Sequence, residues 1–260
     1  MEPSARGGCA DDARQAGHGL CLSVSYIARV QSQYDLIMSS IIFEERPQTL
    51  GEEIANAISH GLGFLLAVAS LPILVVMATR HGTAVNIVAV TVFSVTMMLL
   101  YLSSTLYHAV PEGRVKEFLG RVDHAAIYLF IAGSYTPFAL GVLNGRWGWA
   151  LFGAIWAMAA AGIAVKLMNL LQHPLWSTGL YVGMGWFALL AAGPLIHAMP
   201  TAGLLWLLAG GVAYTLGAIV FIYDSRAKYM HFAWHLFVLA GTTCHFFAAL
   251  WYATPAKLVG

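Results

Sequence analysis

Residues 84–108 read AVNIVAVTVFSVTMMLLYLSSTLYH, a run of apolar and small polar side chains with no Asp, Glu, Lys or Arg. At about 1.5 Å per residue, an α-helix of this length crosses the roughly 30 Å of hydrocarbon in a bilayer. Lipid offers the backbone no water to bond to, so a helix must satisfy its polar groups internally. The stretch therefore predicts a transmembrane helix.

The composition of the whole chain is typical of a membrane protein. Of 260 residues, 59% are hydrophobic and 10% are charged, and the mean hydropathy is +0.73, whereas soluble domains carry about 25% charged residues. The net charge is +1 and the basic residues are scattered, which excludes nucleic acid as a partner. Cys9, Cys21 and Cys244 form no CxxC pair, so neither a disulfide framework nor a thiolate zinc site is indicated.

Apolar stretches of this length recur along the chain, separated by short polar or Gly- and Pro-containing connections. They lack the alternation of barrel strands, so helices are the assignment. We predict an all-α membrane protein, a seven-transmembrane helix bundle within residues 47–260. The expected spans are approximately 54–78, 84–108, 122–143, 148–168, 175–196, 203–223 and 230–252.

Residues 1–46 differ from the rest of the chain, with short apolar pieces too broken for a signal-peptide core and too short to span a bilayer. We expect either a poorly ordered tail or a segment upstream of the true start codon, for which Met38 is a candidate.

The distribution of Lys and Arg predicts the orientation of the bundle. Alternate sides of seven spans hold ten and three basic residues, and the richer side faces the cytoplasm. We therefore expect a multi-pass protein of the inner cell membrane, with its N-terminus cytoplasmic and its C-terminus outside. The ten are Arg6, Arg14, Arg29, Arg46, Arg114, Lys116, Arg121, Lys166, Arg226 and Lys228, and the three are Arg80, Arg146 and Lys257.

Ionisable side chains within the spans gather at one level. His108 ends the second span, Asp123 begins the third, and His231 and His235 open the seventh. His231 and His235 share a helix face because they are four residues apart, and so do Ser104 and His108. Such groups are expensive inside a bilayer and act as pointers to function.

Three imidazoles without a thiolate suit a divalent cation such as Zn²⁺, and three protein ligands leave a fourth position for water. We therefore predict a zinc site with His108, His231 and His235 as ligands. Asp123 is expected to orient or deprotonate the water, with Ser104 as a hydrogen-bonding neighbour. The alternative is that each histidine only bonds a neighbouring helix.

Other polar residues of the spans have alternative roles. Glu53, Asn56 and His60 share one face of the first span and could cap that helix, line the cavity or assist a proton, with His60 as a reserve ligand. His124 must point to a different face from Asp123. His245 lies ten residues beyond His235, about 15 Å along the helix, and is expected to bond a neighbouring helix instead.

These residues also carry a resemblance. Glu53-x2-Asn56-x3-His60, Ser104-x3-His108, the run VDHAAIYLFIAGSYTPF from residue 122 and the run HFAWHLFVLAGTTCHFF from residue 231 resemble the progestin and adiponectin receptor superfamily, in particular its bacterial hemolysin III branch. The resemblance covers about residues 47–252. It implies a seven-helix bundle with zinc held by histidines of helices two and seven, and an Asp that contacts the zinc through water.

The expected function is zinc-dependent hydrolysis of a lipid amide or ester, because three ligands leave a fourth position open. The resemblance also implies a fold shared with the alkaline ceramidases. The alternative is a non-enzymatic protein with structural zinc, either a pore-forming or cytolytic factor or a regulator of membrane energetics. A ligand-sensing receptor is a weaker option. The expected partners are the bilayer and a lipid substrate, and no feature of the sequence sets an oligomeric state.

Overall fold

The computed structural model describes residues 46–170 and 173–253, and the expectations for residues 1–45 and for the C-terminal residues 254–260 lie outside the described part. The chain divides into two units, Met1–Arg46 and Pro47–Gly260, of which the second is described here. Its α-helices are α2 (Leu50–His81), α3 (Ala84–Ala109), α4 (Arg114–Thr136), α5 (Gly145–Leu167), α6 (Pro174–Gly185), α7 (Ala192–Ala198), α8 (Thr201–Ile222) and α9 (Met230–Ala248).

Short segments of other helical geometry continue these helices. They are the π-helical η1 (Pro137–Leu143) and η4 (Ala249–Ala253) and the 3₁₀-helical η2 (Trp186–Ala191) and η3 (Asp224–Arg226). Pro137 opens η1, and Pro194 lies in α7 just after η2, so the spans change geometry near both prolines. Proline has no backbone N–H to donate, which favours such irregular turns.

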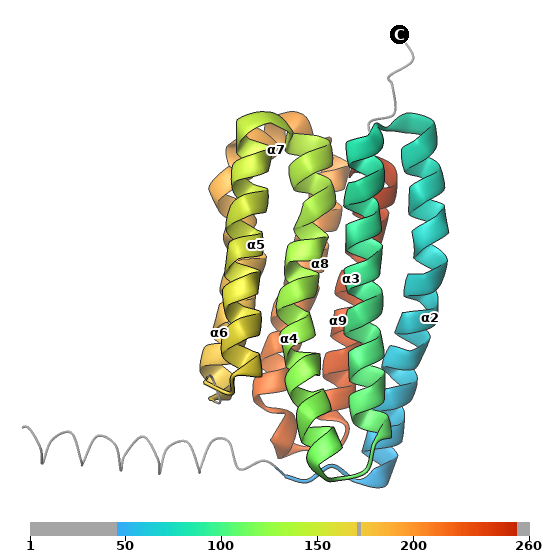
Figure 1. The fold of residues 1–260 in the computed structure, drawn as a ribbon, viewed down its shortest axis with the longest axis vertical. Coiled ribbons are helices and arrows are strands. Elements are labelled where there is room, and N and C mark those ends of the chain that lie inside the picture. The colour runs from blue at the N-terminus through green and yellow to red at the C-terminus, as the bar shows by residue number, and fades with distance from the viewer. Residues whose placement is uncertain (1–45, 171–172, 254–260) are drawn as a thin grey trace, which may run out of the picture. The chain divides into compact units, whose positions relative to one another are not determined.

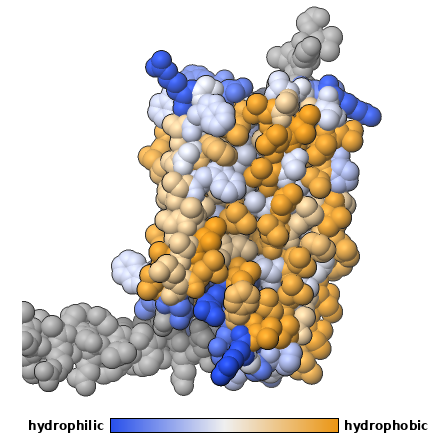
Figure 2. Space-filling model, viewed as in Figure 1, coloured by the Kyte–Doolittle hydropathy of each residue, from blue (hydrophilic) through white to orange (hydrophobic). Residues whose placement is uncertain are grey.

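The described residues contain seven helical segments long and apolar enough to cross a membrane, as predicted. The helices run side by side along one axis, and the visible side surface is mainly hydrophobic, with hydrophilic residues towards its two ends (Figures 1 and 2). Leu65 and Leu66 are 62% and 66% exposed in α2. Apolar side chains exposed to this extent along a helix are accommodated by lipid, so the protein is a membrane-spanning helix bundle.

The residues that cap the N-terminus of α2 also contact the start of the seventh span, α9. The Thr49 hydroxyl and the Glu52 carboxylate form a capping box at the start of α2. The second oxygen of the same carboxylate accepts a hydrogen bond from the Tyr229 backbone N–H at 2.8 Å. Because Tyr229 directly precedes α9 in a left-handed conformation, Glu52 ties together the starts of α2 and α9.

One boundary of the sequence analysis was wrong. The third expected span begins at about residue 122, whereas α4 already begins at Arg114. The early start places Lys116 in a buried position where its ammonium contacts Glu53 of α2 at 2.8 Å. Hydropathy missed this part of the helix because it contains basic residues, which are stable here at the end of the bundle and through this ion pair.

Close packing of α3 against α4 depends on Gly133. A Cβ atom at this position would overlap the Thr96 hydroxyl oxygen. We expect Gly133→Ala to destabilise the protein by about 1–3 kcal/mol, since the helices must move apart. Gly153→Ala in α5 is the matched control, because a Cβ there meets nothing within 4 Å. Unfolding of both variants by denaturant in detergent measures the difference, and equal stabilities would refute the close contact.

Candidate metal centre

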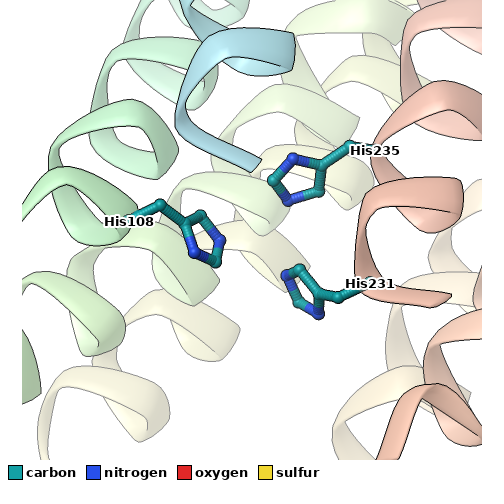
Figure 3. A group of neighbouring side chains, drawn as sticks. All are labelled: His108, His231 and His235. Atoms are coloured by element: carbon teal, nitrogen blue, oxygen red, sulfur yellow. The ribbon is translucent and has the colours of Figure 1, made fainter. Parts of the chain in front are cut away.

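Three histidines from two helices converge at one end of the bundle. His108 lies in the last turn of α3, and His231 and His235 lie in the first turns of α9. One ligand atom from each of the three lies within 4.8 Å of the others. The rings point towards a common centre (Figure 3). The predicted set of three is therefore brought together, and it could hold a metal ion.

His108 is held by a carboxylate from α2. Its Nδ1 lies 2.7 Å from Glu53 Oε2, and Lys116 Nζ donates to Glu53 Oε1 at 2.8 Å. An ionised carboxylate can only accept, so Nδ1 of His108 carries the proton. Lys116 also donates to the Val110 carbonyl oxygen at 3.3 Å, which fixes the turn after α3. The charge of Glu53 is thus balanced, and the imidazole keeps one orientation.

His231 and His235 have equivalent outer partners. His231 Nδ1 lies 2.7 Å from Asp224 Oδ2, in the turn that precedes α9. His235 Nδ1 lies 3.0 Å from the Ser59 hydroxyl oxygen and 3.3 Å from the Asn56 carbonyl oxygen. The Ser59 hydroxyl itself donates to the Asn56 carbonyl, so its oxygen is free to accept from His235. Both imidazoles therefore carry the proton on Nδ1 as well.

The protonation of Nδ1 in each ring leaves the other ring nitrogen free to bind a metal ion. With every Nδ1 bonded outward, Nε2 is the unprotonated nitrogen of each ring and its lone pair is available. Among the described residues, Nε2 of His108 is buried without a hydrogen-bond partner. A buried unsatisfied nitrogen costs about 1–3 kcal/mol unless a ligand occupies it. Three imidazoles oriented by carboxylate or carbonyl oxygens are a typical arrangement for binding a transition-metal ion.

Ser104 lies beside the centre and bonds another histidine. Its hydroxyl oxygen is 2.7 Å from His60 Nδ1. The His60 ring stacks on the His235 ring, with 3.5 Å between centroids and an interplanar angle of 6°. Ser104 therefore orients His60, and His60 in turn covers one face of His235.

Asp123 lies on α4 near the centre. The Ser103 hydroxyl lies 3.4 Å from Asp123 Oδ1 and also donates to the Leu100 carbonyl oxygen at 2.9 Å. Asp123 is within electrostatic range of His231. The carboxylate therefore has the Ser103 hydroxyl as its hydrogen-bond partner and interacts electrostatically with one member of the triad.

The two histidines predicted to lie apart do so. His124 Nδ1 bonds the Gly120 carbonyl oxygen of its own helix at 2.6 Å. His245 Nε2 bonds the Leu207 carbonyl oxygen of α8 at 3.4 Å, which confirms the expected bond to a neighbouring helix.

Sequence reasoning missed several outer partners. Asp224 and Ser59 are not part of the predicted site, and the roles predicted for Glu53 do not include a bond to His108. One signal was available for Glu53, which falls on the same helix face as Asn56 and His60. Asp224 carried a weaker one, because it is the only acid in the connection before His231.

Fold and site together define a class of protein, a seven-span membrane bundle with a histidine triad at one end. A family model described as Haemolysin-III related matches residues 48–246, and the chain belongs to this family. Hemolysin-3 of Bacillus cereus is 45% identical over 208 residues, which cover 80% of this chain and 94% of the relative. The Hemolysin-3 homolog of Bacillus subtilis is 43% identical over 211 residues, which cover 81% and 99%.

A more distant relative shares the same region. The monocyte to macrophage differentiation factor of Homo sapiens is 28% identical over 226 residues, which cover 81% of this chain and 89% of that protein. The predicted resemblance to the hemolysin III family is thus confirmed.

Removal of an outer carboxylate should weaken metal binding without abolishing it. We expect Glu53→Gln and Asp224→Asn each to lower the metal affinity about 10–100-fold, because each imidazole loses the acceptor that orients it. Glu112→Gln is the control, since Glu112 is exposed and lies 3.7 Å from the same Lys116. Competition with a chromophoric chelator measures the affinities. Unchanged affinity in both variants would show that these carboxylates do not support the metal.

Proposed function

We propose that the triad binds Zn²⁺ and that the protein hydrolyses a lipid amide or ester at this site. The observation that carries the proposal is the convergence of one ring nitrogen from each of three histidines, whose Nδ1 atoms already have outer partners. Imidazoles without a thiolate favour a borderline cation such as Zn²⁺, and three protein ligands are the number found in catalytic zinc sites.

The proposed chemistry assigns one task to each residue. A bound Zn²⁺ supplies a Lewis acid that polarises a carbonyl and makes water more acidic. His108, His231 and His235 fix its position. Asp123 accepts the proton of the attacking water and returns it to the leaving nitrogen or oxygen as the acyl bond breaks. The products are a fatty acid and an amine or alcohol, which together account for the atoms of lipid and water.

The location of the site supports a lipid as the substrate. The triad lies where α3 ends and α9 begins, within segments that span the membrane. An acyl chain can reach this level from within the bilayer, whereas a large polar substrate cannot pass between the helices. With the predicted orientation, the site opens towards the cytoplasmic leaflet of the cell membrane.

Release of fatty acid from lipid amides tests the proposal. The purified protein, reconstituted in vesicles that contain N-acyl lipids, is expected to release fatty acid, to stop after chelation, and to recover when Zn²⁺ is restored. Magnesium serves as the control cation because it prefers oxygen ligands. Zinc-bound protein that releases no fatty acid or alcohol from any amide or ester lipid class would refute the hydrolase.

A structural role for the metal is the second candidate. The ligands come from two helices far apart in the sequence, so an ion would clip α3 to α9. In this alternative the protein permeabilises or regulates the membrane without cleaving lipid. Leakage of a dye from vesicles that persists in Asp123→Ala without lipid cleavage would favour it, and zinc-dependent cleavage without leakage would favour the hydrolase.

A further inference from the structure

Two adjacent carboxylates at the start of α2 contact the two helices that carry the triad. Glu53 bonds His108 of α3, whereas Glu52 bonds the backbone just before α9, which carries the other two histidines. Glu52 is only 3% exposed, and it lies outside the motif that carries the family resemblance in the first span. Burial of a carboxylate is costly unless hydrogen bonds offset the loss of water, so the bonds of Glu52 indicate its role.

The helix α9 begins without a capping side chain of its own. Its N-cap residue is Tyr229, whose side chain makes no capping hydrogen bond within the described residues, and the first turn contains no acidic residue. The Tyr229 carbonyl oxygen accepts from the Ala233 N–H at 3.0 Å, and the Tyr229 N–H donates to Glu52 Oε1 at 2.8 Å. A carboxylate at this position also stabilises the positive end of the helix dipole. Glu52 therefore caps α9 from a neighbouring helix.

The same carboxylate caps its own helix. Glu52 Oε2 accepts from the Thr49 backbone N–H at 2.9 Å and from the Thr49 hydroxyl at 2.8 Å. One side chain thus holds the first turns of α2 and α9 together. Because Tyr229 precedes His231 by two residues, a shift of Tyr229 relative to Glu52 would move the imidazoles of α9 relative to the imidazole of α3.

Tyr229 is bonded in a conformation that requires support. Its φ angle is 62°, in the left-handed region. Residues with a Cβ atom rarely adopt this region, because the Cβ atom comes too close to the following carbonyl oxygen. The hydrogen bond to Glu52 offsets this cost. Without the bond, we expect the residue to relax to a negative φ angle and to turn the start of α9 away from its present position.

We propose that Glu52 is a positioning residue of the metal centre, which acts through Tyr229 and sets the distance between the ligands on α9 and the ligand on α3. This inference rests on the proposed function in one respect, the binding of a metal ion by the triad, and it does not depend on lipid hydrolysis. It gives the adjacent acids separate tasks. Glu53 orients one imidazole directly, and Glu52 places the helix that carries the other two.

A matched pair of substitutions at Tyr229 tests the left-handed turn. Tyr229→Gly and Tyr229→Val both remove a ring that is 48% exposed, but only glycine adopts a positive φ angle without strain. We expect Tyr229→Gly to keep the zinc affinity within about twofold and Tyr229→Val to lower it about tenfold, the low end of the cost of losing an outer partner. Competition with a chromophoric chelator measures both affinities. Equal affinities of the two variants would overturn the proposal.

Removal of the carboxylate provides the second test. Glu52→Ala should lower the zinc affinity about tenfold, and adding Tyr229→Gly to the same chain should restore most of that loss, because glycine no longer needs the bond. Thr49→Ala is the matched control, since it removes a hydroxyl from the cap of α2 and leaves the bond to the Tyr229 N–H in place. It should lower the thermal stability of the metal-free protein and leave the zinc affinity unchanged.

Three further results would overturn the role of Glu52. They are an unchanged affinity in Glu52→Ala, equal losses in Glu52→Ala and Thr49→Ala, and a loss that Tyr229→Gly does not restore. If Glu52→Ala does not fold, the pair at Tyr229 decides the question alone. A zinc-binding protein that releases no fatty acid refutes the hydrolase and leaves these comparisons valid, whereas a protein that binds no zinc refutes both proposals.

Discussion

His231→Ala is expected to leave the purified protein with little or no zinc, whereas the unchanged protein is expected to bind one zinc per chain. The substitution removes one of three ligands, so the loss of affinity should exceed the roughly 10–100-fold cost of losing an outer partner. It also leaves Asp224 without the ring that it orients, at 2.7 Å in the intact protein. Metal content is measured by plasma mass spectrometry after dialysis against a weak chelator.

The control for this variant removes an imidazole elsewhere. His197 is exposed in the last turn of α7, and His197→Ala should retain the full zinc content. His108→Ala and His235→Ala should both behave as His231→Ala does, because in the proposed site the three rings hold one ion. Full zinc content in all three variants would contradict the metal centre, provided that each variant remains folded by circular dichroism.

Asp123→Asn is expected to retain zinc but to lower lipid hydrolysis about 10²–10⁴-fold, the usual contribution of a general acid–base group. The amide is similar in size to the carboxylate and can still accept from Ser103, whose hydroxyl lies 3.4 Å from Asp123 in the intact protein. It cannot take up the proton of water at neutral pH. The measurement is the initial rate of fatty acid release at saturating zinc.

Two results would separate a proton-transfer role for Asp123 from a structural one. A structural role predicts that Asp123→Asn loses zinc or unfolds, and the rate falls only in proportion. Proton transfer predicts unchanged zinc content with a slow rate. Glu117→Gln on the exposed face of α4 is the control and should change neither quantity. A full rate in Asp123→Asn would remove this residue from the reaction.

The fold was predictable because each membrane span is a continuous run of about twenty mainly apolar residues, which can be recognised from the local sequence alone. Every expected span lies within, or within one residue of, a helical segment of the structure. The helix α4 begins well before the expected third span, because the charges of Arg114–Arg121 resemble a loop in a hydropathy profile although the chain is helical there. The partner of the buried Lys116 could not be inferred, since Glu53 lies 63 residues away in the sequence.

The candidate site was predictable in its inner part only. His231 and His235 are four residues apart, and His108 ends a span at the same level, so spacing and depth were enough to group them. The outer partners depend on how α2 and the turn before α9 are rotated against α3 and α9. That rotation depends on helix packing and on the hydrogen bond between Glu52 and the Tyr229 backbone N–H. Neither can be predicted from the spacing of residues in the sequence.

X-ray absorption at the zinc edge tests the central claim most directly. The purified protein should give a spectrum of one zinc per chain with three imidazole nitrogens at about 2.0–2.1 Å and one additional oxygen ligand. His231→Ala should lose this signal. A spectrum with a sulfur ligand at about 2.3 Å, a zinc surrounded by oxygen alone, or a protein that binds no zinc under any loading condition would contradict the histidine centre.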